Sequence, residues 1–131
     1  MNTRAINPQT WLNGFHLNSA IEVTNGQRVL YCSGQTSNDA AGAPLHPGDI
    51  RAQFKLAWAN LLEILAAADM QPANIVRLNF YTTDVDGFMS HAAELSQIWA
   101  DAGAKPASTL LGVDKLFQPN AVIELEATAV A

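Results

Sequence analysis

Residues 75–82, which read IVRLNFYT, decide the fold because apolar and polar side chains alternate along them. Leu78 and Phe80 fall on one face of such a strand, since successive side chains of a strand point in opposite directions. The other face carries Arg77 and Tyr81. This pattern predicts a strand with one face in a core and the other face open, as in a sheet that helices cover on one side.

Two helix patterns flank this strand. The first predicts an amphipathic helix over residues 50–69, which Asp49 caps. The second helix opens at Asp84 and ends at Gly103. Each helix has an apolar stripe at helical spacing: Ile50, Phe54, Trp58, Leu61, Leu65 and Ala68 in the first, and Phe88, Ala92, Leu95 and Trp99 in the second.

Further strands are predicted towards both ends of the chain. The order of elements is then β-β-α-β-α-β-β, an α+β fold in one domain over residues 1–131, with a mixed sheet and both helices on one face. Asn25-Gly26 predicts a hairpin turn between the first two strands. The strands are expected near the end of 16–23, at 29–32, and over 107–113 and 121–129.

Composition restricts the classes of partner. The net charge of −5 and pI of about 4.9 argue against a nucleic-acid or anionic-membrane binder, which needs a basic surface. The N-terminal residues have no apolar core of a signal peptide, and no apolar run is long enough to span a membrane. We therefore expect a cytoplasmic domain, and the charged fraction of only 15% indicates self-association.

Most groups that could carry chemistry have a structural explanation. The three histidines lack the spacing of metal ligands, so no metal site is expected. Cys32 lies in an apolar run without a nearby base, which favours a buried structural cysteine over a nucleophile. Asp84 and Asp86 stand where a helix begins, which favours capping over a catalytic pair.

Glu124 and Glu126 are the exception, because a period of two places both carboxylates on one strand face. One interpretation is a solvated outer face. The other is a cleft in which one carboxylate holds a water molecule or acts as a general acid or base. The pattern alone leaves both open.

The chain resembles the Rid family, the reactive intermediate deaminases, which are also called the YjgF or "endoribonuclease L-PSP" family. The resemblance runs from about residue 19 to the C-terminus. It rests on the order of several short segments: Ser33-Gly34-Gln35 after a strand, Ala52-Gln53 in a long helix, Asp84 and Phe88 in the second helix, Pro106-Ala107 before a strand, and Ile123-Glu124-Leu125-Glu126-Ala127 near the end.

This resemblance implies a chorismate-mutase-like fold that assembles as a homotrimer, with the open sheet faces packed together and three clefts between subunits. It also implies hydrolysis of reactive enamines and imines, such as 2-aminoacrylate, to keto acids and ammonia without a cofactor. A small-molecule ligand in the cleft, rather than a nucleic acid or a membrane, is the implied partner.

Five positions match the family's site residue by residue. Glu124 corresponds to the glutamate that positions water, and Leu110 to a position whose backbone N–H helps to bind a carboxylate. Ser33 and Gly34 correspond to a strand end that lines the cleft, and Phe88 to an aromatic residue at its edge.

The family's carboxylate-binding arginine is missing, because Ser108 follows Pro106-Ala107 where that arginine stands. A serine offers one neutral donor in place of two charge-assisted bonds. Arg77 is the best substitute cation, although an ordinary surface or interface charge is the alternative. The function expected is a Rid-type hydrolase, and the alternative is a binding member that has lost deamination; an RNA-directed activity is the weakest of the three.

Overall fold

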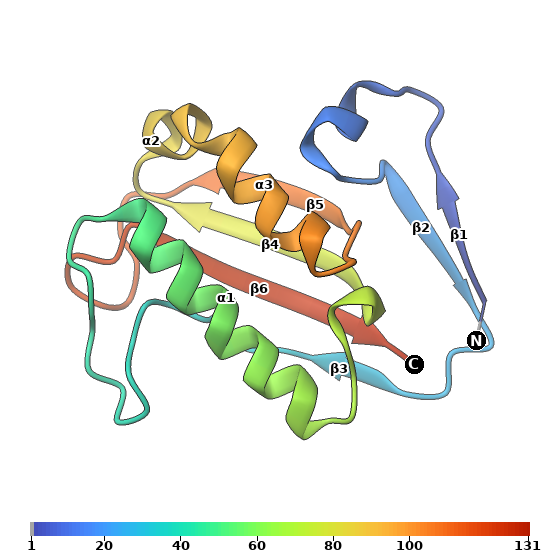
Figure 1. Cartoon of the computed structure of the whole chain (residues 1–131), viewed down its shortest axis with the longest axis horizontal. Helices are drawn as coiled ribbons and strands as arrows, with labels where there is room; N and C mark the ends of the chain where they lie inside the picture. The colour runs from blue at the N-terminus through green and yellow to red at the C-terminus, as the bar shows by residue number, and fades with distance from the viewer. Residues whose placement is uncertain (1) are drawn as a thin grey trace.

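A mixed sheet of four strands, in the order β3–β6–β4–β5, forms the centre of the computed structural model, which describes residues 2–131 (Figure 1). A separate ribbon of β1 and β2 lies at the N-terminus. The elements are β1 (Asn2–Ile6), η1 (Trp11–Phe15), β2 (Ala20–Thr24), β3 (Val29–Tyr31), α1 (Ile50–Ala67), η2 (Pro72–Asn74), β4 (Ile75–Thr82), α2 (Val85–Ser90), α3 (Ala92–Asp101), β5 (Ala107–Gly112) and β6 (Ile123–Val130), where η marks a 3-10 turn.

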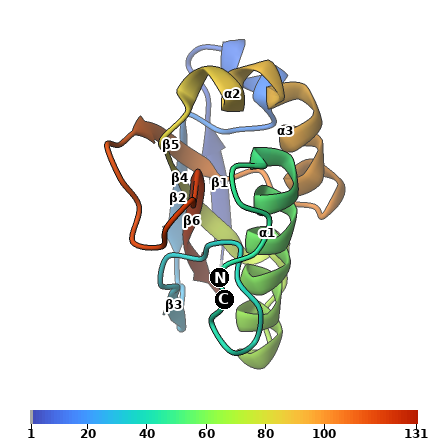
Figure 2. The ribbon, with the colours of Figure 1, turned by 90° about the vertical axis from the view of Figure 1, so that its left-hand side faces the viewer.

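The predicted central strand is confirmed in its bounds and in its two faces. β4 pairs antiparallel with β6 and parallel with β5. Leu78 and Phe80 are buried, whereas Arg77 is exposed. α1 and α3 lie on the buried side of the sheet, and Figure 2 shows no helix of residues 2–131 on the opposite side. The expected α+β architecture with helices on one face is therefore correct.

Aromatic side chains from both helices meet the sheet at the centre of the core. The ring centroids of Phe54 in α1 and Phe80 in β4 are 6.1 Å apart, and those of Phe80 and Trp99 in α3 are 5.1 Å apart. Each such pair contributes about 0.5–1.5 kcal/mol beyond the burial of its area. This cluster fixes both helices against the strand that carries Asn79 and Tyr81 on its other face.

The predicted hairpin at Asn25-Gly26 is wrong. Asn25 does adopt the left-handed conformation of a tight turn, with φ of 57°. However, β2 pairs with β1 and β3 pairs with β6, so the two strands on either side of the turn lie in different sheets. The left-handed Asn25 bends the chain but does not pair its two flanking strands, and β1, which supplies the partner of β2, carries no strong strand pattern.

The second helix is divided where the sequence predicts a continuous one. Asp84 caps it as expected, since its Oδ1 accepts a hydrogen bond of 2.9 Å from the Gly87 N–H. His91, with φ of −111°, then ends α2 and precedes α3. The break lets Phe88 and Trp99 pack on the same core from two differently directed segments.

No helix of residues 2–131 is long and apolar enough to cross a bilayer.

Candidate active site

Glu124 and Glu126 lie on the open face of the sheet, as the period-two pattern predicts. In the pairing of β6 with β4, Glu124 stands opposite Tyr81 and Glu126 opposite Asn79. All four side chains are half-buried. The sheet thus groups two carboxyls, a phenol and an amide on a surface that no helix of the described residues covers (Figure 2).

Glu126 is held by two hydrogen bonds from β4. The Tyr81 hydroxyl donates to Glu126 Oε1 over 2.9 Å, and Asn79 Nδ2 donates to the same oxygen over 3.2 Å. The bond that the Tyr81 hydroxyl donates to Glu126 is the main cause of the raised pKa of Tyr81. The side chain of Glu126 is therefore held in place on the open face beside Glu124.

Of the two glutamates, Glu124 is the one whose carboxyl pKa is shifted. Partial burial raises the pKa of the Glu124 carboxyl above its ordinary value, and the charge of Glu126 raises it further. A carboxyl with a raised pKa gives and takes protons nearer to neutral pH, which is the requirement for general acid–base catalysis. Glu124 is therefore the group on this face best suited to move a proton.

The backbone beside Glu124 has to be glycine. A Cβ added to Gly34 would lie 1.9 Å from Glu124 Oε1, so the carboxylate rests directly on the Gly34 backbone. A β-bulge brings the two together: Tyr31 pairs with Thr128 and Gln35 with Leu125, so four steps on one strand oppose three on the other. Ser33 and Gly34 occupy this bulge, and the structure thus joins Gly34 with Glu124.

Three other predicted site residues lie on the opposite, helix-covered face of the sheet. The parallel pairing of β5 with β4 places Ser108 beside Leu78 and Leu110 beside Phe80. Ser108, Leu110 and Phe88 line one cavity of about 250 Å³. Within one chain, the predicted residues therefore form two groups: the Glu124 group on the open face, and the Ser108 group on the helix-covered face.

Arg77 belongs to the open face, but its side chain is engaged elsewhere. Its Nη2 donates a hydrogen bond of 2.7 Å to Thr109 Oγ1 on β5. Arg77 stands opposite Thr128, whereas Glu124 stands opposite Tyr81, four residues further along β4. Within this chain Arg77 therefore lies on the same face as Glu124 but does not contact it.

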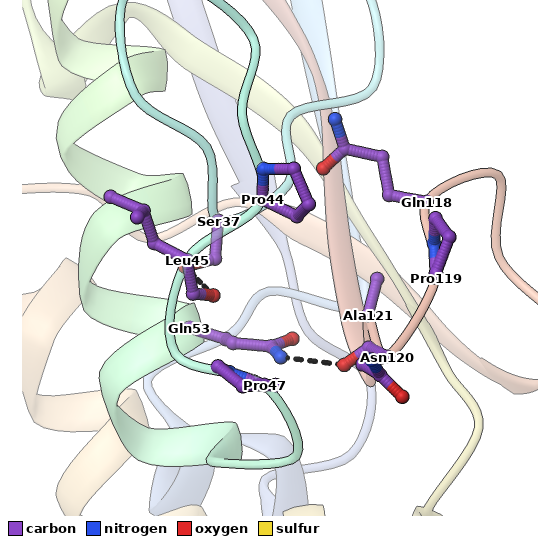
Figure 3. A pocket seen from close by; sticks show the side chains of 9 residues that line it. All are labelled: Ser37, Pro44, Leu45, Pro47, Gln53, Gln118, Pro119, Asn120 and Ala121. Atoms are coloured by element: carbon purple, nitrogen blue, oxygen red, sulfur yellow. Dashed lines mark hydrogen bonds between the residues drawn. The ribbon is translucent and has the colours of Figure 1, made fainter.

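A second pocket, of about 140 Å³, contains the buried Gln53 and is structural (Figure 3). Gln53 Nε2 donates to the carbonyl oxygens of His46 and Asn120 over 2.9 and 2.8 Å, and its Oε1 accepts from the Val122 N–H over 2.8 Å. Both ends of this amide are thus occupied by backbone groups of two loops. Its position in an amphipathic helix gave no signal for this role.

The remaining candidates have no catalytic setting. Cys32 is buried in the core, and desolvation raises the pKa of its thiol, which opposes formation of the nucleophilic thiolate. Within residues 2–131, no three His, Cys, Asp or Glu side chains are grouped so that they could hold a metal ion.

Comparison with known proteins assigns the family. The family model described as endoribonuclease L-PSP matches residues 16–131. The crystal structure of YyfB from Yersinia pestis, a Rid-family protein of unknown function, has a TM-score of 0.86 and 34% identity over 100% of both chains. A RutC family protein of Aquifex aeolicus is 32% identical over 111 residues, which are 85% of each chain.

A named enzyme is similar over a shorter stretch. The 2-iminobutanoate/2-iminopropanoate deaminase of Bos taurus is 36% identical over 61 residues, which are 47% of this chain and 44% of that protein. The chain described here belongs to the Rid (YjgF) family and has its chorismate-mutase-like fold.

Proposed function

We propose that this protein is a Rid-type hydrolase of a reactive enamine or imine, with Glu124 as the residue that positions and activates water. The observation that carries the proposal is the placement of Glu124 against Gly34, with a carboxyl pKa raised by burial and by Glu126. The 2-iminobutanoate/2-iminopropanoate deaminase relatives support the reaction class.

In this reaction Glu124 acts first as a general base and then as a general acid. Water adds to the carbon of the C=N bond while the Glu124 carboxylate accepts one of its protons. When the imine nitrogen is protonated, this addition gives a neutral carbinolamine. The Glu124 carboxyl returns its proton to the carbinolamine nitrogen, and the C–N bond breaks as ammonia leaves. The hydroxyl proton passes to the Glu124 carboxylate and then to ammonia, so the products are a carbonyl compound and an ammonium ion. An acid–base group in this role accounts for about 10²–10⁴-fold in rate.

We further propose that the site is completed between copies of the chain in a homotrimer. The two groups of predicted residues lie on opposite faces of one sheet, so a single chain does not bring Ser108 to Glu124. A cleft in which the Ser108 group of one subunit faces the Glu124 group of the next unites them. Ser33, which precedes Gly34 in the bulge, and Arg77, on the same face as Glu124, are then the candidate substrate contacts.

A coupled assay tests this function. A pyridoxal-phosphate enzyme or an amino-acid oxidase generates 2-aminoacrylate and a range of imines, and ammonia release is compared between wild type and Glu124→Gln. We expect wild-type release above the uncatalysed rate and a loss of at least about 100-fold in Glu124→Gln. Glu63→Gln, an exposed glutamate on α1, is the matched control and should retain full activity.

The second candidate is a binding protein on the same scaffold, and Ser108 favours it because the carboxylate clamp is absent. Ser108→Arg restores a bidentate donor and should raise the release of ammonia from 2-imino acids. Wild-type activity no greater than the uncatalysed rate with every imine, in a folded protein, would reject the hydrolase and leave the binding function.

A further inference from the structure

The cavity on the helix-covered face is a preformed, almost wholly apolar chamber. Its volume is about 250 Å³. Residues of β4, β5, α2 and α3 form its wall, and residues of the η1 turn near the N-terminus form its cover. The side chains that define it include Leu12, Phe15, Phe88, Ala92, Ser108 and Leu110.

The cover is fixed to the rest of the molecule at its end and at its outer side. Trp99 Nε1 donates a 3.0 Å hydrogen bond to the His16 carbonyl, directly after η1. Lys105 Nζ donates to Asn13 Oδ1 over 3.0 Å. These bonds hold η1 in place without a ligand, so the chamber is already formed in the chain alone.

The η1 part of the cover precedes the segment that the family model matches, whereas the similarity to the YyfB structure spans the whole chain. The match begins at residue 16, whereas Trp11, Leu12 and Phe15 precede it. The η1 residues that make the chamber apolar on that side therefore lie before the segment that the family model matches.

The lining of the chamber has few groups that could stabilise an anion. None of the described residues that line it is ionisable. The indole N–H of Trp11 is bonded to Gln9 Oε1 and that of Trp99 to His16, which leaves the Ser108 hydroxyl as the side-chain donor free for a ligand among the described lining residues. A carboxylate that entered would lose its hydration in exchange for one neutral hydrogen bond, which is unfavourable.

We propose that this chamber binds an uncharged aromatic or branched apolar group with one hydrogen-bonding atom directed at Ser108. The inference rests on the proposed function and its trimer, because it names the non-reacting part of the substrate whose imine carbon is presented to Glu124 of the neighbouring subunit. The chamber is large enough for such a group, since a dry cavity of about 150 Å³ in another protein accepts benzene. The substrates are thus neutral imines or enamines with an apolar side group, rather than small 2-imino acids.

The test compares benzamide with benzoate, two probes of one shape that differ in charge. Binding is followed by two-dimensional ¹H–¹⁵N NMR of the indole N–H signals. Trp99 lines the chamber and should report binding, whereas Trp58 is buried in α1 outside it and serves as the internal reference. We expect benzamide to bind at least about tenfold more tightly than benzoate, and Ser108→Arg to reverse this preference.

A chamber-filling variant locates the site. Ala92→Leu, at a buried wall position, should weaken benzamide binding at least tenfold, while Ala66→Leu on the exposed side of α1 should leave it unchanged. Benzoate binding as tight as benzamide, no saturable shift of Trp99, or unaltered binding in a folded Ala92→Leu protein would each overturn the inference.

Turnover separates this inference from the proposed function. Glu124→Gln, on the opposite face of the sheet, should still bind benzamide. Retained binding with no hydrolysis of any imine would reject the hydrolase and keep the chamber. Hydrolysis of 2-imino acids in preference to neutral imines would reject the chamber's role and keep the hydrolase.

Discussion

At the scale of single residues, the raised pKa of Glu124 makes stability depend on pH. Between the pKa of Glu124 in the unfolded chain and its higher value in the folded protein, the folded state binds more protons. The contribution of this group to the free energy of unfolding is therefore largest below that window and is lost as pH rises through it. The hydrogen bond with Arg51 lowers the pKa of the exposed Glu94. The contribution of Glu94 to the free energy of unfolding is therefore lost as pH falls rather than as it rises.

Replacement of Glu126 tests the electrostatic cause. Glu126→Gln removes the neighbouring charge, so the pKa of Glu124 should fall but stay above its ordinary value, since burial is the larger cause. The pKa of Tyr81 should fall as well, because it loses its bond to an anion. Carboxyl ¹³C NMR titration measures the first change. Glu22→Gln, on the exposed β2 strand, is the control, and an unchanged Glu124 pKa in Glu126→Gln would contradict the assignment.

The close approach of Gly34 to Glu124 is a steric prediction at the same scale. Gly34→Ala must displace the carboxylate, because the added Cβ would lie 1.9 Å from Oε1. We expect a destabilisation of about 1–3 kcal/mol and a changed Glu124 titration, measured by urea unfolding and NMR. Gly14→Ala, where the added Cβ has nothing within 4 Å, should change neither quantity. A Glu124 titration unaltered in Gly34→Ala would show that the contact does not set its environment.

The sequence predicted one half of the site better than the other. Alternation was enough to place Glu124 and Glu126 on one face, because the period of a strand is a local property. It could not assign Ser108 and Leu110 to the other face, since that follows from the parallel register of β5 on β4, a contact between distant segments. The role of Gln53 was also hidden, because two of its three backbone partners, Asn120 and Val122, lie in a loop far along the chain.

At the scale of elements, the beginning of α1 holds two loops through one amide. Gln53→Ala would leave the His46 and Asn120 carbonyls and the Val122 N–H without this partner. We expect a loss of about 3 kcal/mol in the free energy of unfolding, measured with urea, because buried polar groups are left unsatisfied. Gln97→Ala, which removes an exposed bond to Asp101, should cost under about 0.5 kcal/mol. A similar small cost for both variants would refute the structural role of Gln53.

Element prediction succeeded where one periodicity ran without interruption. The helix expected over 50–69 ends at Ala67, and the strand expected over 75–82 has those bounds. It failed where partner choice decides the structure: at Asn25-Gly26, whose strands join different sheets, and at His91, which divides the second helix.

At the scale of the whole molecule, the open sheet face exposes apolar side chains that favour association. Tyr31 is 80% exposed, and Val29 and Leu111 on the same face are also exposed. We predict a trimer built through this face, as the family resemblance implies. Tyr31→Glu should shift the mass in light scattering towards the monomer, because a carboxylate would be buried. Ala66→Glu on the helix side should remain trimeric; a monomeric wild-type protein at micromolar concentration would contradict the prediction.

The position of η1 in the chain has a consequence for how such a protein diversifies. Residues 2–24 contribute no strand to the four-stranded sheet, and in pairing they meet it through one bridge between Asn18 and Ala107. The segment that covers the chamber can therefore change in sequence without disturbing the register of the sheet or the setting of Glu124. Exchange of this terminal segment between relatives would change the lining of the chamber as a unit, while Glu124 stays with the rest of the chain.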